Sequence, residues 1–389
     1  MMDSQTTGSR GAPSAAAAGA ALSGSLAGAS FRFCTTASDL AAYARAHLAP
    51  LASAVSEARN LDATLRWHEG QPPPDRTAAF PHLAGMERVD RDLYVRPGEL
   101  HWFRVDELRD LYLHFTWREN RLSIAGDYYH RLANDVYRDR AKRIVYWRWV
   151  RVLRKRRFTT LLYYLVYYPC WWWLEQVQDL HPIHAAAVGI GSDVILLGGA
   201  SGVGKSTLAV ALASLPGATL LSDSFVMHNG AEVAAVREPV LLDAWSRRWL
   251  GEHGQDLQPI GWRYCLNRQG YHLPPDRLAA GGRCNLLLFP RRAPETYVRR
   301  IAAQQAHQRL SAADLIINDL RRYWAFAATL EQVAPGGLVA RREAQLARLT
   351  AEMPCYELGL PADMTCAAAV DSILQLLPGK ALRAVGARQ

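Results

Sequence analysis

A glycine-rich run near the middle of the sequence restricts the possible folds more than any other segment. It fits the pattern G-x-x-x-x-G-K-[ST] at every fixed position, with the residues Gly199, Ala200, Ser201, Gly202, Val203, Gly204, Lys205 and Ser206. Apolar periodicity predicts a buried strand at Asp193–Leu197 before the run and a helix at Lys205–Leu215 after it. A glycine-rich turn between a buried strand and a helix is the setting of a phosphate-binding loop, or P-loop. The sequence therefore predicts an α/β domain built around such a loop.

Each residue type of the run suits a nucleoside triphosphate. The glycines let the backbone bend until successive N–H groups converge on phosphate oxygens. Lys205 would place a positive charge on the terminal phosphates, and the hydroxyl of Ser206 is a ligand for Mg²⁺. We expect residues 199–207, with Thr207 as the last, to bind ATP together with Mg²⁺.

Two further polar residues are predicted to lie near this loop. Asp223 follows the apolar strand predicted at Ala218–Leu221, and we expect this strand to neighbour the strand before the loop. Asp223 could hold Mg²⁺ or accept a proton from an attacking hydroxyl, and the alternative is a turn-capping role. His184 begins the segment His-Ala-Ala-Ala-Val at the start of another predicted strand, and it is either a site residue or an ordinary core histidine.

Taken together, these features resemble the core of the HPr kinase/phosphorylase family. The resemblance rests on His184-Ala185-Ala186-Ala187-Val188, the loop Gly199–Thr207 and Leu220-Leu221-Ser222-Asp223, and it covers about residues 180–236. Relatives of that family include kinases of lasso-peptide gene clusters and, more distantly, ATP-dependent phosphoenolpyruvate carboxykinase. The resemblance implies a P-loop kinase core in which Lys205 and Ser206 serve phosphate and metal. It also implies that Asp223 is the catalytic acid/base and that His184 lines the site.

The sequence departs from the family pattern at two positions. The family usually has two adjacent acids at the strand end, whereas Ser224 follows Asp223 here, so one carboxylate is missing unless another acid such as Glu238 replaces it. HPr kinase usually has Glu after the Lys-Ser pair, and this chain has Thr207, which argues against HPr as the substrate. Arg291 and Arg292 follow the strand predicted at Cys284–Phe289 and could clamp the transferred group or lie in a solvated loop.

Composition and patterning divide the chain into five parts. Residues 1–30 are mostly Ala, Gly and Ser and are predicted to be a disordered tail, as are residues 379–389. Residues 31–135 read as a small α+β domain with a helix at Ser38–Leu48 and strands that include Glu99–Val105. Residues 136–180 read as a helical connector, and residues 181–378 as the nucleotide-binding α/β domain, with a long helical stretch from Pro294 to about Leu330.

The connector combines a basic cluster with an uncharged aromatic stretch. Six Arg and Lys residues fall within positions 148–157, and they could attract an acidic partner or form a solvated helix face. The uncharged stretch Phe158–Leu174 is short for a membrane span and carries three Trp, so we predict a buried helix, with membrane-surface contact as the alternative. The six cysteines lack metal-site spacing, and no export signal is evident, which favours a cytoplasmic location.

From these features we expect an ATP- and Mg²⁺-dependent kinase that acts on a hydroxyl of a peptide, protein or small molecule. The alternative is a nucleotide-binding regulatory or scaffold protein with weak transfer, which the missing second acid favours. The hypothesis of a nucleic-acid-associated ATPase rests only on the net charge of +9 and is disfavoured. The sequence is compatible with a homo-oligomer and does not specify the acceptor.

Overall fold

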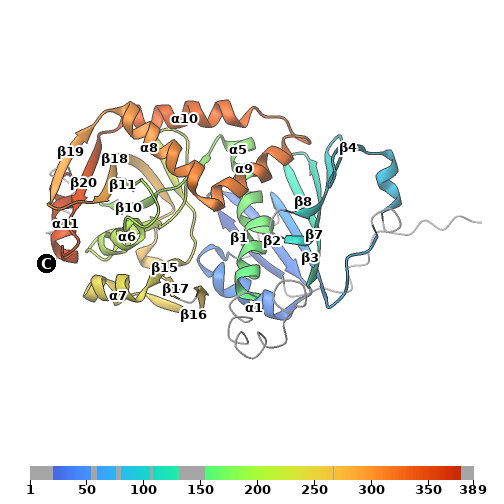
Figure 1. The fold of residues 1–389 in the computed structure, drawn as a ribbon, viewed down its shortest axis with the longest axis horizontal. Coiled ribbons are helices and arrows are strands. Elements are labelled where there is room, and N and C mark those ends of the chain that lie inside the picture. The colour runs from blue at the N-terminus through green and yellow to red at the C-terminus, as the bar shows by residue number, and fades with distance from the viewer. Residues whose placement is uncertain are drawn as a thin grey trace, which may run out of the picture.

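The chain folds into two β-sheet regions joined by buried helices, as the computed structural model shows (Figure 1). The structure describes residues 21–377 except 54–58, 76–79, 106–107, 131–153 and 266. Residues 1–20 of the predicted N-terminal tail, the whole predicted C-terminal tail and the basic cluster up to residue 153 lie outside the described residues. Within these limits the chain is a mixed α/β protein with several mixed sheets, as the sequence predicted at that level.

The N-terminal region is one eight-stranded sheet with the strand order β1-β2-β3-β8-β7-β6-β5-β4. Its strands are β1 (Ala21–Leu26), β2 (Ala29–Thr35), β3 (Leu61–Glu69), β4 (Glu87–Asp90), β5 (Leu93–Arg96), β6 (Glu99–Val105), β7 (Leu108–Arg118) and β8 (Arg121–His130). Helix α1 (Ser38–His47) follows β2, and short 3₁₀ turns lie at Ala49–Leu51 and Pro81–Gly85. Glu119 and Asn120 both have positive φ and form the hairpin turn that joins β7 to β8.

The prediction of a disordered N-terminal tail is wrong for residues 21–30, because these residues belong to this sheet. Strand β1 pairs antiparallel with β2 through a turn at Ala27-Gly28, where both φ angles are positive. A Cβ on Gly24 would lie 2.5 Å from the carbonyl oxygen of Leu51, so the small residues allow close packing at this edge. Composition alone did not reveal this, because β1 has only two large apolar residues, Leu22 and Leu26, among Ala, Ser and Gly.

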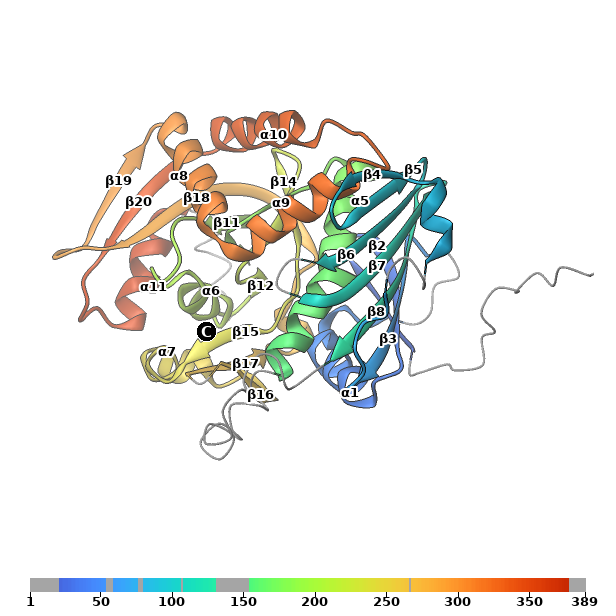
Figure 2. The ribbon, with the colours of Figure 1, turned by 45° about the vertical axis from the view of Figure 1, so that its right-hand side comes forward.

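The aromatic connector is a buried helix, as predicted for Phe158–Leu174. Helical structure runs from residue 154 through the π-helical turn η3 (Tyr163–Tyr167) into α5 (Tyr168–Gln178). Figure 2 shows α5 along one face of the N-terminal sheet, and Trp171 and Trp172 are completely buried. Within the described part of the chain, every helix is too short or too polar to cross a bilayer.

The C-terminal region is a nine-stranded mixed sheet with helices on both faces. Its strands are β9 (His181–Ile183), β10 (Ala186–Ile190), β11 (Asp193–Leu197), β12 (Ala218–Ser222), β13 (Val226–His228), β14 (Glu232–Ala235), β18 (Gly281–Arg292), β19 (Tyr297–Ile301) and β20 (Cys355–Leu360). Helices α6 (Lys205–Ala213) and α11 (Cys366–Leu374) cover one face. Helices α8 (Ala303–Ile316) and α10 (Leu338–Glu352) cover the other.

The predicted direct pairing of β11 with β12 is wrong. Strand β10 lies between them and is antiparallel to both. The reason is a tight hairpin, in which Ile190 pairs with Asp193 around Gly191, whose φ is 62°. This hairpin occupies the edge of β11 on which β12 was expected. Strands β11 and β12 still run in the same direction, so their carboxyl ends share one side of the sheet.

The predicted helical stretch from Pro294 is wrong at its start. Tyr297–Ile301 forms β19, which pairs antiparallel with β20. The helical part comprises α8 and α9 (Asn318–Leu330), and α9 packs onto the connector and the N-terminal sheet. A separate three-stranded sheet contains β15 (Val240–Asp243), β16 (Gln258–Cys265) and β17 (Arg268–His272), with α7 (Ala244–Leu250) and 3₁₀ turns at Gly251–Gly254 and Pro275–Arg277.

Candidate active site

The loop between β11 and α6 has the backbone conformation that anion binding needs. Gly199, Gly202 and Gly204 have φ angles of 109°, 85° and 97°, a region that residues with a Cβ rarely adopt. No atom lies within 4 Å of a Cβ built on Gly202 or Gly204, so the loop is open on that side. Gly204 is the residue before the first turn of α6, whose free N–H groups carry partial positive charge. The loop and the helix start therefore combine an open glycine backbone with partial positive charge, which suits phosphate.

The side chain of Lys205 contacts the backbone at the start of this loop. Its Nζ atom donates hydrogen bonds to the carbonyl oxygens of Gly199, at 2.7 Å, and Ala200, at 2.8 Å. Burial lowers the pKa of Lys205 to about 8, although Asp223 and Asp314 act in the opposite direction. The ammonium group is thus charged at neutral pH and is held where phosphate oxygens would replace the two carbonyls.

Ser206 and Asp223 come together at the carboxyl ends of β11 and β12. The Ser206 hydroxyl donates to the backbone carbonyl of Asp223 at 3.3 Å. The Asp223 side chain is buried, and burial raises its pKa to about 6 despite hydrogen bonds from Ser206 and Ser224. A hydroxyl and a carboxylate are hard oxygen donors of the kind that Mg²⁺ prefers, so these two residues fit a magnesium site beside the phosphates.

His184 also lies at this end of the sheet, just before β10. Its ring is 5.3 Å from that of Phe225, and burial together with the charge of Lys205 lowers the pKa of His184 to about 3. The imidazole is therefore neutral at physiological pH. Together with Lys205, Ser206 and Asp223, His184 belongs to the group of predicted residues that the fold brings close together.

Asp314 is a site residue that sequence reasoning missed. It lies in α8, and its Oδ1 accepts a hydrogen bond from the backbone N–H of His184 at 2.8 Å. Burial raises the pKa of Asp314 to about 7, while this hydrogen bond and the charges of Arg342 and Lys205 oppose the rise. No local motif surrounds Asp314 in the sequence, so only the packing of α8 against the sheet reveals it.

Glu238, considered above as a substitute for the missing second acid, faces the same region. Its Oε1 atom is buried, and burial raises the pKa of Glu238 well above its usual value. A hydrogen bond from Tyr163 of the connector opposes this rise, while the charge of Asp223 adds to it. Glu238 is thus close enough to Asp223 for the two carboxyl groups to influence each other.

A hollow beside the P-loop is lined by two tryptophans of α7. Trp245 and Trp249 lie with Val203, Gly204 and Thr207 around a space of about 30 Å³. Trp245 is 44% exposed, and Trp249 donates its indole N–H to the carbonyl of Met364 at 2.8 Å. The hollow is too small for a nucleobase, but the exposed Trp245 ring at its rim offers a flat stacking surface. Sequence reasoning missed both residues because α7 is far from the motif in the chain.

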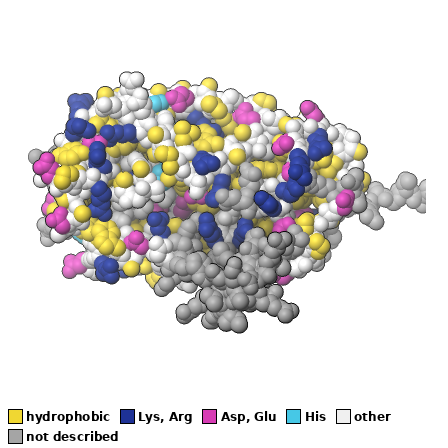
Figure 3. Space-filling model, viewed as in Figure 1, with side chains coloured by type: hydrophobic (Ala, Val, Ile, Leu, Met, Phe, Trp, Pro, Cys, Tyr) yellow, Lys and Arg dark blue, Asp and Glu magenta, His cyan; other side chains and the backbone are white. Residues whose placement is uncertain are grey.

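Arg291 and Arg292, considered above as a clamp or as part of a solvated loop, lie at the end of strand β18 and have different surroundings. The guanidinium carbon of Arg292 lies 5.4 Å from the Trp245 ring centroid, so Arg292 belongs to the hollow. Arg291 is 3.7 Å from the carboxylate of Glu357, which Arg299 and Arg309 also approach at 2.7 Å each. Figure 3 shows basic side chains along the edge formed by β19 and β20. Arg291 thus belongs to a cluster of arginines around the buried carboxylate of Glu357. Arg299 of this cluster lies in strand β19.

Comparison with known proteins gives no further assignment. No protein-family model matches the chain, and no curated protein sequence matches it.

Proposed function

We propose that this chain binds ATP with Mg²⁺ at the P-loop and transfers the γ-phosphoryl group to a hydroxyl of a peptide, protein or small molecule. The observation that carries the proposal is the convergence of Lys205, Ser206 and Asp223 at the carboxyl ends of two strands. An ammonium, a hydroxyl and a carboxylate in this arrangement are the groups that phosphoryl transfer requires. The resemblance to HPr kinase-like enzymes agrees with it and remains a prediction.

In this proposal the residues have distinct roles, and Asp223 has two. The loop N–H groups and Lys205 hold the triphosphate and stabilise charge on the transferred group. Ser206 and Asp223 would hold Mg²⁺, which neutralises phosphate charge when it is bound. Asp223 accepts the proton of the acceptor hydroxyl while the new O–P bond forms and the bond to the β-phosphate oxygen breaks, which releases ADP. A pKa of about 6 suits this role, because the carboxylate is ionised at neutral pH and is more basic than an ordinary aspartate.

Trp245 and Arg292 give the base of the nucleotide a place to bind. The Trp245 ring is exposed beside Gly204 and Thr207, at the start of α6. A base stacked on this ring, with the Arg292 guanidinium nearby, would gain dispersion and cation–π energy. A triphosphate that extends from there along the loop would present its terminal phosphate to Lys205.

The alternative function is nucleotide binding with weak or no transfer. Ser224 in place of a second acid favours it. Asp314 and Glu238 weigh against it, because Asp314 interacts with Lys205 and Glu238 with Asp223, so the region does not lack carboxylates. We therefore favour the kinase.

The test measures binding and transfer separately. ATP affinity with Mg²⁺ is measured by calorimetry, and transfer is followed with γ-labelled ATP in a lysate of the source cells. Both use the wild type, Lys205→Ala, Asp223→Ala and the control Lys155→Ala, whose lysine lies in the connector helix. We expect wild type and the control to bind ATP and label an acceptor, Lys205→Ala to lose both properties, and Asp223→Ala to retain binding but lose transfer.

Two results would contradict the proposal. Binding without any labelled product in wild type would favour the regulatory alternative. Absence of ATP binding in wild type would remove both functions.

A further inference from the structure

The outer face of the N-terminal sheet carries a cluster of polar side chains remote from the P-loop. Glu99 and His101 are two residues apart on β6, so both project from the same face of the sheet. His114 on β7 is the direct cross-strand neighbour of His101. The opposite face of these strands, with Leu100 and Leu113, packs into the core. Strand alternation and register together therefore bring three potential metal ligands into contact.

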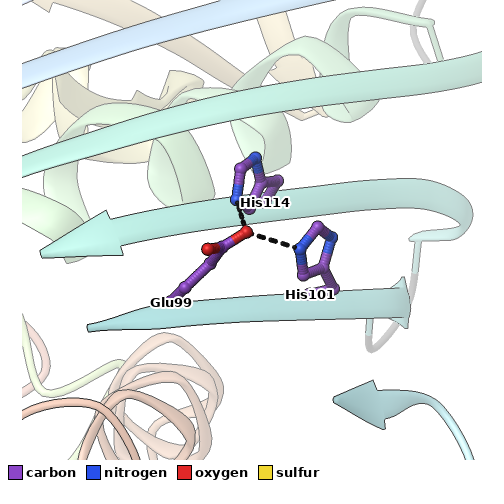
Figure 4. Close-up of side chains that lie close together, drawn as sticks. All are labelled: Glu99, His101 and His114. Atoms are coloured by element: carbon purple, nitrogen blue, oxygen red, sulfur yellow. Dashed lines mark hydrogen bonds and ion pairs between the residues drawn. The ribbon is translucent and has the colours of Figure 1, made fainter. Parts of the chain in front are cut away.

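The three side chains converge on a single atom, as Figure 4 shows. The Oε1 atom of Glu99 is 3.0 Å from Nε2 of His101 and 2.9 Å from Nε2 of His114. The two imidazole rings are stacked with their centroids 4.2 Å apart. The three potential ligand atoms all lie within 4.8 Å of one another, which is close enough for them to bind one metal ion together.

The two distances from Glu99 to the histidines are close to those of a zinc site. Zn²⁺ binds nitrogen and oxygen ligands at about 2.0–2.1 Å, so the ligands of a tetrahedral ion lie about 3.3 Å apart. The Glu99 oxygen would have to move away from each histidine by only a few tenths of an ångström. His101 is buried, whereas the His114 side chain is 29% exposed and gives access from solvent.

The groups around the cluster hold its ligand atoms in place. Nδ1 of His101 lies 2.6 Å from the hydroxyl of Tyr112, whose oxygen can accept a hydrogen bond from Nδ1–H, so that the lone pair of Nε2 can bind a metal. Arg96 donates to Oε2 of Glu99 at 2.7 Å, so Oε1 is the oxygen that faces the histidines. Metal ligands in proteins are commonly oriented by such outer hydrogen bonds.

We propose that Glu99, His101 and His114 bind one divalent transition-metal ion, of which Zn²⁺ is the best fit. Two imidazoles and one carboxylate are the ligand set of many zinc centres that keep a fourth position for water or substrate. Tyr112 also lines a cavity of about 310 Å³ with Phe80, Phe103 and Tyr129. A molecule bound in that cavity would therefore touch the outer shell of the metal site.

The experiment uses the full chain after removal of metal by a chelator. Zn²⁺ binding is measured by equilibrium dialysis with elemental analysis, and the geometry by the visible absorption of bound Co²⁺. The variants are His114→Ala, Tyr112→Phe and the control His68→Ala. His68 is matched because it lies on the same sheet face, is similarly exposed and contacts a buried carboxylate, Asp127, at 2.7 Å.

We expect wild type and His68→Ala to bind one Zn²⁺ per chain and to give tetrahedral Co²⁺ spectra. His114→Ala should lose at least about 100-fold in affinity and Tyr112→Phe about 10-fold, with far-ultraviolet circular dichroism unchanged. Equal affinity in wild type and His114→Ala, or no Zn²⁺ binding in folded wild type, would overturn the proposal. The latter result would leave a hydrogen-bonded cluster without a metal.

Discussion

Two buried carboxylates in this molecule have opposite surroundings and opposite pKa shifts. Glu175 in α5 is completely buried, yet hydrogen bonds and charge from Arg342, with His181, overcome burial and lower its pKa. Arg342 contacts both oxygens of Glu175, Tyr323 donates to one of them, and His181 Nδ1 lies 2.8 Å from the other. Asp223 is also buried, but among the described residues it forms no ion pair, and its pKa rises to about 6.

The difference separates a carboxylate whose charge is compensated from one whose charge is not. The negative charge of Glu175 is fully matched inside the protein, so this carboxylate has little tendency to bind a proton or an added cation. The charge of Asp223 is only partly compensated, so a proton or a metal ion that reaches it is bound favourably. Burial alone therefore does not distinguish the two roles, and the partners of each carboxylate do.

The largest expected effect is on phosphoryl transfer. In the proposed mechanism Asp223→Asn removes the proton acceptor and a metal ligand, so transfer should fall by about 10²–10⁴-fold, whereas ATP affinity should change much less. Initial rates of label transfer to the acceptor check this. If the variant keeps more than a tenth of the wild-type rate, Asp223 is not the proton acceptor.

The next effect concerns stability at the matched carboxylate. Glu175→Gln leaves Arg342 buried without its counter-charge, so the free energy of unfolding should fall by about 3–5 kcal/mol. The control Arg348→Ala breaks an exposed pair with Glu352 and should cost less than about 0.5 kcal/mol. Urea unfolding measures both. A similar small loss in both variants would contradict the role given to Glu175.

A smaller effect is the pH dependence of stability at Asp223. Its folded-state pKa is raised to about 6, so the native state binds the proton more tightly than the unfolded chain. Its contribution is present at low pH and is lost as pH rises from about 4 to about 6. Asp223→Asn has no carboxyl group at this position and so lacks this loss. Without nucleotide, the free energy of unfolding of the variant minus that of wild type should therefore be about 1–3 kcal/mol larger at pH 7 than at pH 4. A pH-independent difference between the two proteins would show that Asp223 is not poised in this way.

The smallest expected effect is on base binding. Trp245→Ala should weaken ATP binding by about 10-fold because the stacking surface is lost, while Trp245→Phe should restore most of the affinity. Calorimetry with ATP and with inorganic triphosphate separates base from phosphate contacts. Loss of triphosphate affinity in Trp245→Ala would mean that the substitution disturbs the P-loop instead.

The sequence predicted the parts of the site that depend on local patterns. The P-loop glycines, Lys205, Ser206 and Asp223 follow from a motif and from the end of an apolar strand. Asp314 and Trp245 could not be predicted, because they reach the loop only through the packing of α8 and α7. In the fold, most strands with alternating apolar residues were recognised. The position of β10 between its neighbours was missed because periodicity does not encode which strands pair.

The core of the connector also determines how the protein unfolds. Trp171 and Trp172 belong to one continuous apolar cluster with Phe115 of the N-terminal sheet and Phe326 of α9. Neither half can separate without exposing these rings to water. Calorimetry should therefore record a single melting transition for the whole chain, and a chain cut after residue 180 should aggregate instead of folding as an autonomous domain.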